Sequence, residues 1–252
     1  MNAGNITKLK VVQVSDCHVS SDPNDDYRGF RAGRMLESLL PALRDFQPDL
    51  LLLTGDVSED ASPESYGRVS ALMCSIGAPV LALPGNHDVP QTMERFFPNG
   101  PWDGPKFHFE KGWQLVLLDS TRPNEIAGRF PEGHLESLRE ELARSEAANI
   151  LVALHHQPVE VGSPWIDKYA LQEPMSLLKI LKQDSRVRCV TWGHIHQGFS
   201  ETLGGIHMLG APSTVANSLP GREKFTADAA GPACRWLVLG SEGSVETGLL
   251  RA

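Results

Sequence analysis

Residues 83–90 of the sequence, LPGNHDVP, end the apolar run 80–83 and place an amide, an imidazole and a carboxylate side by side. An apolar run of this kind is typical of a buried strand. The same change from apolar to polar recurs after four other runs, in the segments SDCH (15–18), TGD (54–56), LHHQP (154–158) and WGHIH (192–196). The repetition indicates that these strand ends serve a common purpose.

The apolar runs alternate with helical patterns along most of the chain. We expect strands at 10–15, 49–54, 79–83, 113–119, 149–155 and 187–192, and helices at 31–46, 62–76 and 131–147. Continuous apolar strands separated by helices indicate sheets that are covered on both faces. The last third differs, because 198–210 and 235–249 are typical of hairpins, the first turning at Gly204-Gly205. The sequence therefore predicts an α/β fold with added antiparallel strands near its end.

In an open α/β sheet, sites form where the carboxyl ends of the strands meet. Five polar strand ends would then lie around one crevice. Each motif taken alone is weak, since Asp-x-His or Gly-Asp is often only a turn or a cap. Together they predict that Asn86 and His87 face a shared site and are not lost in a core.

Composition narrows the class of protein. The 252 residues carry a formal net charge of −8, with 41% hydrophobic and 21% charged residues, as in ordinary globular proteins. This balance argues against a binder of long nucleic acids, which would normally present a basic face. A phosphate ester remains compatible as a substrate, because bound metal ions can supply positive charge locally.

The N-terminal stretch MNAGNITKLKVVQVSD has a short polar leader and then a strand, and lacks the apolar stretch of a signal peptide. No apolar run approaches the length of a membrane span. The four cysteines form no CxxC pair, and reduced cysteines are the simpler interpretation. We therefore expect a cytoplasmic protein with no membrane partner.

The candidate site residues favour metal chemistry. Asp, His and Asn side chains without cysteine suit borderline to hard metals such as iron, manganese or zinc. One carboxylate shared between two imidazole-bearing halves suits a pair of ions about 3.5–4 Å apart. The sequence thus predicts two divalent metal ions.

The five blocks D-x-H, GD, GNHD, HH and GHIH, in this order from Asp16 to His196, resemble the signature of the calcineurin-like metallophosphoesterases. A closer resemblance is to the bacterial class III cyclic nucleotide phosphodiesterases, carried by LDS (118–120), HHQPVEVGSPWID (155–167) and APST (211–214). The resemblance implies one domain over residues 1–252 with a four-layer αββα double β-sandwich, two metals in its loops, and C-terminal antiparallel strands.

The resemblance also implies a ligand set, with all seven positions present in this chain. One metal would be held by Asp16, His18, Asp56 and His196, and the other by Asp56, Asn86, His155 and His194. Asp56 would bridge the two metals together with a water or hydroxide. In the double-histidine block His155 is the expected ligand, and His156 either supports it or touches the substrate.

The implied reaction is hydrolysis of 3',5'-cyclic nucleotides, cyclic AMP first, to 5'-monophosphates. Asp56 and His87 are the expected catalytic residues, and Asn86, His87 and His156 the expected substrate contacts. We expect His87 to protonate the leaving oxygen, with Asp88, Glu59 or Asp60 as its acidic partner. Trp165 could stack on the base or anchor a loop.

Other functions remain open at this point. A broader phosphodiesterase would act on 2',3'-cyclic nucleotides or glycerophosphodiesters, whereas a nuclease is disfavoured because no basic groove is evident. A non-catalytic scaffold of the same fold would be expected to lose metal ligands, and this chain keeps them all. The expected partner is a small cyclic nucleotide, with no stable nucleic acid, and a homodimer is compatible with the sequence.

Overall fold

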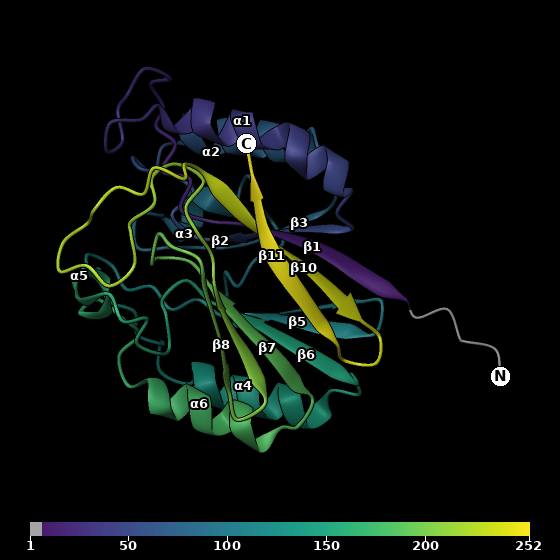
Figure 1. Cartoon of the computed structure of the whole chain (residues 1–252). Helices are drawn as coiled ribbons and strands as arrows, with labels where there is room; N and C mark the ends of the chain where they lie inside the picture. The colour runs from purple at the N-terminus through teal and green to yellow at the C-terminus, as the bar shows by residue number, and fades with distance from the viewer. Residues whose placement is uncertain (1–6) are drawn as a thin grey trace.

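Two β-sheets lie face to face in the computed structural model, which describes residues 7–252 (Figure 1). The polar leader at residues 1–6 lies outside this range. The first sheet has the strand order β11-β10-β1-β2-β3, with β1 at its centre, parallel to β2 and antiparallel to β10. Its strands are β1 (Lys8–Val14), β2 (Leu50–Thr54), β3 (Val80–Leu83), β10 (Ala233–Gly240) and β11 (Val245–Arg251).

The second sheet has the order β4-β5-β6-β7-β9-β8. Strands β5, β6, β7 and β9 run parallel, and antiparallel strands β4 and β8 form its two edges. Its strands are β4 (Lys106–Glu110), β5 (Trp113–Leu117), β6 (Asn149–Ala153), β7 (Val187–Trp192), β8 (Phe199–Leu203) and β9 (Ile206–Gly210).

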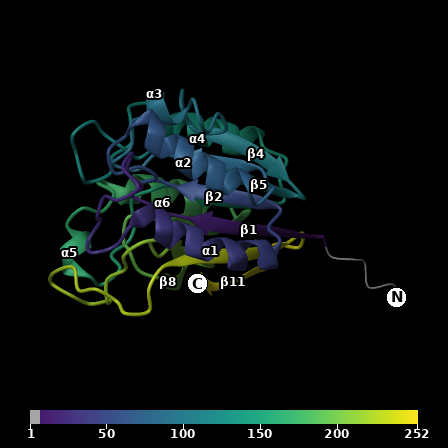
Figure 2. The same ribbon diagram turned by 90° about the horizontal axis from the view of Figure 1, so that it is seen from above.

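Helices cover the outer face of each sheet and complete four layers. The helices α1 (Ala32–Phe46) and α2 (Pro63–Cys74) lie on the first sheet, and α4 (His134–Arg144) and α6 (Pro174–Gln183) lie on the second (Figures 1 and 2). Two single turns, α3 (Pro90–Met93) and α5 (Pro164–Asp167), sit in loops. Within residues 7–252, every helix is too short or too polar to cross a lipid bilayer.

Strand alternation builds three apolar layers from these elements. Leu50 and Leu52 of β2 pack between the two sheets with Trp113 of β5. Leu51 and Leu53, on the opposite face of the same strand, pack against α1 and α2. A third cluster fills the space between the second sheet and helices α4 and α6. Because β2 is buried on both faces, its sequence is apolar without alternation, as expected for a parallel strand.

The predicted α/β fold is confirmed, including the αββα layers and both C-terminal hairpins. Ser62 caps α2, since its side chain accepts a hydrogen bond from the N–H of Ser65. Helix α4 is shorter than the predicted 131–147, because Gly133 takes a left-handed conformation before it and Ser145 is extended after it. Strand β4 and helix α6 were not predicted.

A buried polar bridge joins the two sheets near the carboxyl ends of their central strands. Gln13 of β1 donates from Nε2 to the hydroxyl of Thr54, at 2.9 Å, and to the carbonyl of Trp192, at 3.0 Å. Its Oε1 accepts from the hydroxyl of Thr191. The side chains of Gln13, Thr54 and Thr191 are fully buried, so these hydrogen bonds satisfy polar groups that water cannot reach.

Replacing Gln13 with Met should lower the free energy of unfolding by about 1–3 kcal/mol, because it leaves the buried partners of Gln13 without a hydrogen bond. Urea denaturation measures the change. Gln183→Met, at the exposed end of α6, is the control and should change the stability by less than about 0.5 kcal/mol. Equal denaturation midpoints for Gln13→Met and wild type would show that the bridge does not stabilise the fold.

Candidate metal centre

The carboxyl ends of β1, β2 and β3 in one sheet, and of β6 and β7 in the other, meet along one cleft. The structure brings together the sequence-predicted metal ligands that follow these strands: Asp16, His18, Asp56, Asn86, His155, His194 and His196. At the centre, ligand atoms of Asp16, Asp56 and His155 lie within 4.8 Å of one another. Both sheets therefore contribute to one site.

The backbone around the cleft is strained. The residues in the left-handed region include five of the predicted ligands: Asp16 (φ 53°), His18 (φ 44°), Asp56 (φ 48°), His194 (φ 66°) and His196 (φ 47°). This conformation costs a residue other than glycine roughly 1–2 kcal/mol. Strain of this kind persists only where the surrounding structure enforces it, and it gathers at functional sites.

Two glycines let the strand ends approach each other. A Cβ atom at Gly85 would overlap the carboxylate and the backbone nitrogen of Asp56, and one at Gly193 would overlap the hydroxyl of Ser15. Gly85 therefore lets the loops after β2 and β3 of the first sheet meet, and Gly193 lets the loop after β7 of the second sheet meet the end of β1.

The first half of the site is built around His18 and His196. Their Nε2 atoms lie 3.3 Å apart. Nε2 of His196 is 3.4 Å from Oδ1 of Asp16, and Nε2 of His18 is 3.7 Å from Oδ2 of Asp56. All four residues are buried.

The second half contains Asn86, His155 and His194. Nε2 of His155 is 3.5 Å from the same Oδ2 of Asp56 that faces the first half. Within the described residues, Asn86 Oδ1, His155 Nε2 and His194 Nε2 are buried and have no hydrogen-bond partner. Buried polar atoms are rarely left unpaired. Three buried, unpaired atoms that can act as metal ligands fit a bound cation.

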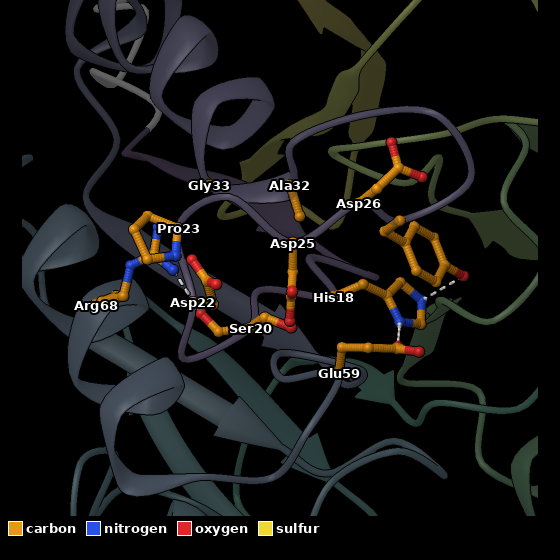
Figure 3. Close-up of a pocket in the computed structure, with 11 residues that line it drawn as sticks. His18, Ser20, Asp22, Pro23, Asp25, Asp26, Ala32, Gly33, Glu59 and Arg68 are labelled. Carbon is orange, nitrogen blue, oxygen red and sulfur yellow. Dashed lines mark hydrogen bonds and ion pairs between the residues drawn. The ribbon is translucent and has the colours of Figure 1, made fainter.

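Hydrogen bonds on the far side of three imidazoles fix their orientation. Nδ1 of His155 donates to the carbonyl of Thr54 at 2.7 Å, and Nδ1 of His196 donates to the carbonyl of Ala216 at 2.8 Å. Nδ1 of His18 lies 2.7 Å from a carboxylate oxygen of Glu59, as Figure 3 shows. A carbonyl can only accept, so the ring proton of His155 and His196 sits on Nδ1. Each Nε2 lone pair then faces the site, as in metal-bound histidines.

Burial and neighbouring charges set the protonation of these residues. Burial lowers the pKa of His18 and lowers that of His194 strongly, which favours neutral rings. Burial opposes ionisation of Asp56, but the neighbouring histidines, His155 first, together outweigh it and hold the pKa of Asp56 well below its usual range. Burial also opposes protonation of His155, but its neighbours, Asp56 first, together outweigh it and raise the pKa of His155 to about 9. A proton and a metal ion would therefore compete for His155.

His87 lies at the rim of the cleft. Its side chain is 37% exposed, and its Nδ1 is 3.2 Å from the Oε2 atom of Glu59 that also binds His18. Its backbone N–H donates to Oδ1 of Asp56 at 2.9 Å. Burial opposes protonation of His87, but Glu59 and Asp56 outweigh it and raise the pKa of His87 to about 9.

Of the three acidic residues that the sequence offered to His87, the structure places Glu59 beside it. Asp88 is buried and accepts the backbone N–H groups of Val57, Ser58 and Gly85. Asp60 accepts the backbone N–H groups of Ser21 and Ser62. The sequence could not separate these carboxylates, because their partners come from distant parts of the chain.

His156 has protein partners on both ring nitrogens. Nδ1 lies 2.8 Å from the hydroxyl of Ser120, and Nε2 lies 3.0 Å from the carbonyl of Ile126. The ring is fully buried, and burial lowers the pKa of His156 to about 3. This histidine braces the loop that contains Ile126, and its contact with substrate stays a prediction.

The cleft in front of the ligands has a volume of about 180 Å³. Its walls include Tyr27, Arg28 and Trp165, of which the sequence indicated only Trp165. Tyr27 and Arg28 were missed in the sequence because the only local feature beside them is Gly29, which indicates a turn and not a binding site. A second hollow of about 100 Å³ lies beside His18 and Glu59, and the acidic stretch 22–26 lines it (Figure 3).

Two sheets that deliver buried carboxylates and imidazoles to one cleft define the metallophosphoesterase class. The sequence profile of the calcineurin-like phosphoesterases matches residues 9–198. The chain belongs to this family. It is 36% identical to a 3',5'-cyclic adenosine monophosphate phosphodiesterase, CpdA, of Pseudomonas aeruginosa, over 96% of this chain and 89% of the relative.

Other relatives agree with this placement. The CpdA protein of Escherichia coli K12 is 30% identical over 95% of this chain and 88% of its own length. A solved dimetal phosphatase of Danio rerio shares the fold, with a TM-score of 0.72 and 16% identity over 96% of this chain and 98% of that one.

Replacing Gly85 with Ala should displace Asp56 and weaken metal binding by about tenfold or more, as is typical when residues that support metal ligands are changed. Equilibrium dialysis against Mn²⁺ followed by metal analysis measures the affinity. Gly67→Ala is the control, because a Cβ there would meet only the Phe96 side chain at an ordinary 3.4 Å. Wild-type metal affinity in Gly85→Ala would contradict the role given to this glycine.

Proposed function

We propose that this chain is a metal-dependent phosphodiesterase that hydrolyses 3',5'-cyclic nucleotides, cyclic AMP first, to 5'-monophosphates. The observation that carries the proposal is the set of buried atoms of Asn86, His155 and His194 that have no partner within the described residues, beside a cleft that Asn86 and His194 line. The CpdA relatives, which align along nearly the whole chain, support the choice of substrate.

In this proposal the two halves of the site each hold one divalent ion. Asp16, His18, Asp56 and His196 hold the first, and Asp56, Asn86, His155 and His194 hold the second. Asp56 lies 3.7 Å from His18 and 3.5 Å from His155 through a single oxygen, which suits a bridging carboxylate. Nitrogen and oxygen donors without sulfur favour iron or manganese, with zinc as the alternative.

Bound metals would neutralise the charge of the phosphodiester and lower the pKa of an attacking water. The residues of the chain then have separate tasks. Asp56 brings negative charge to the centre of the site, where the two halves meet. Asn86 contributes a neutral oxygen, which leaves the second ion more electron-poor than a further carboxylate would.

His87 is proposed to protonate the leaving oxygen. Cleavage of the 3' ester produces an alkoxide, which is a poor leaving group without a proton. His87 reaches into the same cleft as the ligands, and Glu59 holds its Nδ1, so Nε2 is free to face the substrate. General acid catalysis of this kind contributes about 10²–10⁴-fold.

We further propose that residues 1–252 act as one phosphoesterase domain, since both sheets supply ligands to the same site. The partner is a small cyclic nucleotide, with Trp165 close enough to the ligands to stack on its base. A cytoplasmic location and a homodimer are compatible with this function.

A substrate panel tests the function. Metal-reconstituted protein should turn over 3',5'-cyclic AMP at least as well as 3',5'-cyclic GMP, and faster than 2',3'-cyclic AMP, glycerophosphocholine or bis(p-nitrophenyl) phosphate. Asp56→Asn provides the background rate. Should cyclic AMP react no faster than an acyclic diester without a base, a broader phosphodiesterase would be the better assignment. No turnover of any diester by metal-loaded protein would favour a scaffold.

His87→Ala tests the proton donor. Both metals should be retained, because Glu59 still binds His18 and the backbone N–H at position 87 still binds Asp56. The kcat for cyclic AMP should fall about 10²–10⁴-fold, whereas bis(p-nitrophenyl) phosphate, whose phenolate leaves unaided, should lose much less. His108→Ala, on the edge strand β4, is the matched control. Equal losses on the two substrates would mean that His87 positions the phosphate and donates no critical proton.

A further inference from the structure

A tight turn at the rim of the cleft aims one hydroxyl at the metal centre. The backbones of Tyr27 and Phe30 pair through two hydrogen bonds of 2.8 and 3.0 Å. Arg28 (φ 54°) and Gly29 (φ 90°) form the two-residue tip. Two consecutive positive φ angles are typical of a type I′ turn, and such an angle is uncommon for arginine. The turn therefore holds Tyr27 and Arg28 in one defined arrangement.

Tyr27 lies flat on a proposed metal ligand. Its ring stacks on that of His18 with centroids 4.0 Å apart and planes within 9° of parallel. The phenol oxygen is 3.1 Å from Nε2 of His18. This is hydrogen-bond distance, so the phenol O–H faces the Nε2 lone pair when no metal is bound. A metal on Nε2 would take that lone pair and leave the phenol proton for another acceptor.

Arg28 fixes the direction of that proton. Its Nε–H donates to the phenol oxygen of Tyr27 at 3.2 Å, so one lone pair of the oxygen is already used. The guanidinium stacks over the ring of Phe225 at 4.1 Å, which holds it from the other side. Within residues 7–252, Arg28 is the only arginine or lysine among the side chains that line the cleft.

We propose that the phenol of Tyr27 donates a hydrogen bond to a phosphoryl oxygen of the substrate, and that Arg28 is a positioning residue for Tyr27. This inference rests on the proposed function. The phenol keeps its proton throughout and forms no bond to phosphorus. It stabilises negative charge on the phosphoryl oxygens as the nucleophile adds, next to the first half of the metal site.

Tyr27→Phe is the direct test, because phenylalanine keeps the stack on His18 and removes only the hydroxyl. Metal content should equal that of wild type. Orthophosphate should bind about tenfold more weakly to the metal-loaded protein by isothermal titration calorimetry, and kcat/KM for cyclic AMP should fall by about tenfold or more, since a hydrogen bond to a charged group is lost. Ser176→Ala removes an exposed hydroxyl of α6 that does not line the cleft and should change neither value by more than about twofold.

Either of two results would overturn the assignment of Tyr27. Unchanged orthophosphate affinity and rate would show that the hydroxyl makes no contact with the phosphate. Loss of metal from Tyr27→Phe would show that the hydroxyl supports His18 and has a structural role.

A double-mutant cycle tests Arg28. Arg28→Ala should weaken orthophosphate binding about threefold in wild type and have no further effect in Tyr27→Phe, because a residue that acts through Tyr27 has nothing left to position. Equal weakening in both backgrounds would mean that Arg28 contacts the phosphate itself and is not a positioning residue.

Orthophosphate binding does not depend on which diester is hydrolysed. If the protein cleaves bis(p-nitrophenyl) phosphate but not cyclic AMP, the proposed substrate is wrong, and orthophosphate binding to Tyr27→Phe still tests the hydrogen bond from the phenol. If cyclic AMP is cleaved and Tyr27→Phe behaves as wild type, only the inference about Tyr27 fails.

Discussion

Much of the metal centre is built to hold two imidazole nitrogens face to face with no proton between them. Nε2 of His18 and Nε2 of His196 are 3.3 Å apart, while Glu59 and the carbonyl of Ala216 hold the opposite nitrogen of each ring. Lone pairs at this distance repel each other, and a cation placed between them turns the repulsion into attraction. The anchors behind each ring, the burial of the rings and the left-handed backbone at both residues keep them from turning away.

The free energy that opposes this arrangement comes from backbone strain in the short loops that carry the ligands. The free energy that stabilises it comes from the apolar layers packed around the strands before those loops. Each left-handed ligand opposes folding by about 1–2 kcal/mol. Directly before these loops, β1, β2 and β7 are buried on both faces, and full burial of one aliphatic side chain contributes about 1.5–3 kcal/mol. The loops can therefore stay strained because the strands that precede them have little freedom to move.

Much of this architecture could be predicted because its signals are local. A run such as Leu50–Thr54, apolar at four of its five positions, identifies a buried strand, and the polar residues after each parallel strand lie at the same sheet edge. The rest depends on tertiary contacts. Glu59, and not Asp88, pairs with His87 because of the path of the loop 57–60. The carboxylate of Asp88 fixes that path by accepting hydrogen bonds from the backbone N–H groups of Val57 and Ser58. Tyr27 and Arg28 could not be placed, because Phe225, over which Arg28 stacks, is some two hundred residues away. Strand β4 was missed because its half-buried, half-polar sequence has no continuous apolar run.

The bridge centred on Gln13 has a consequence for the distances between ligands within each half of the metal centre. Each half takes ligands from both sheets, so sliding one sheet over the other would change those distances. Apolar side chains between the sheets resist separation but tolerate small shifts, since hydrophobic contact has no preferred direction. Hydrogen bonds are directional, and those of Gln13 to Thr54 and to the carbonyl of Trp192 join the strand ends that carry Asp56 and His194. In this fold, the buried amide of Gln13 therefore fixes the distance between the ligands carried by one sheet and those carried by the other.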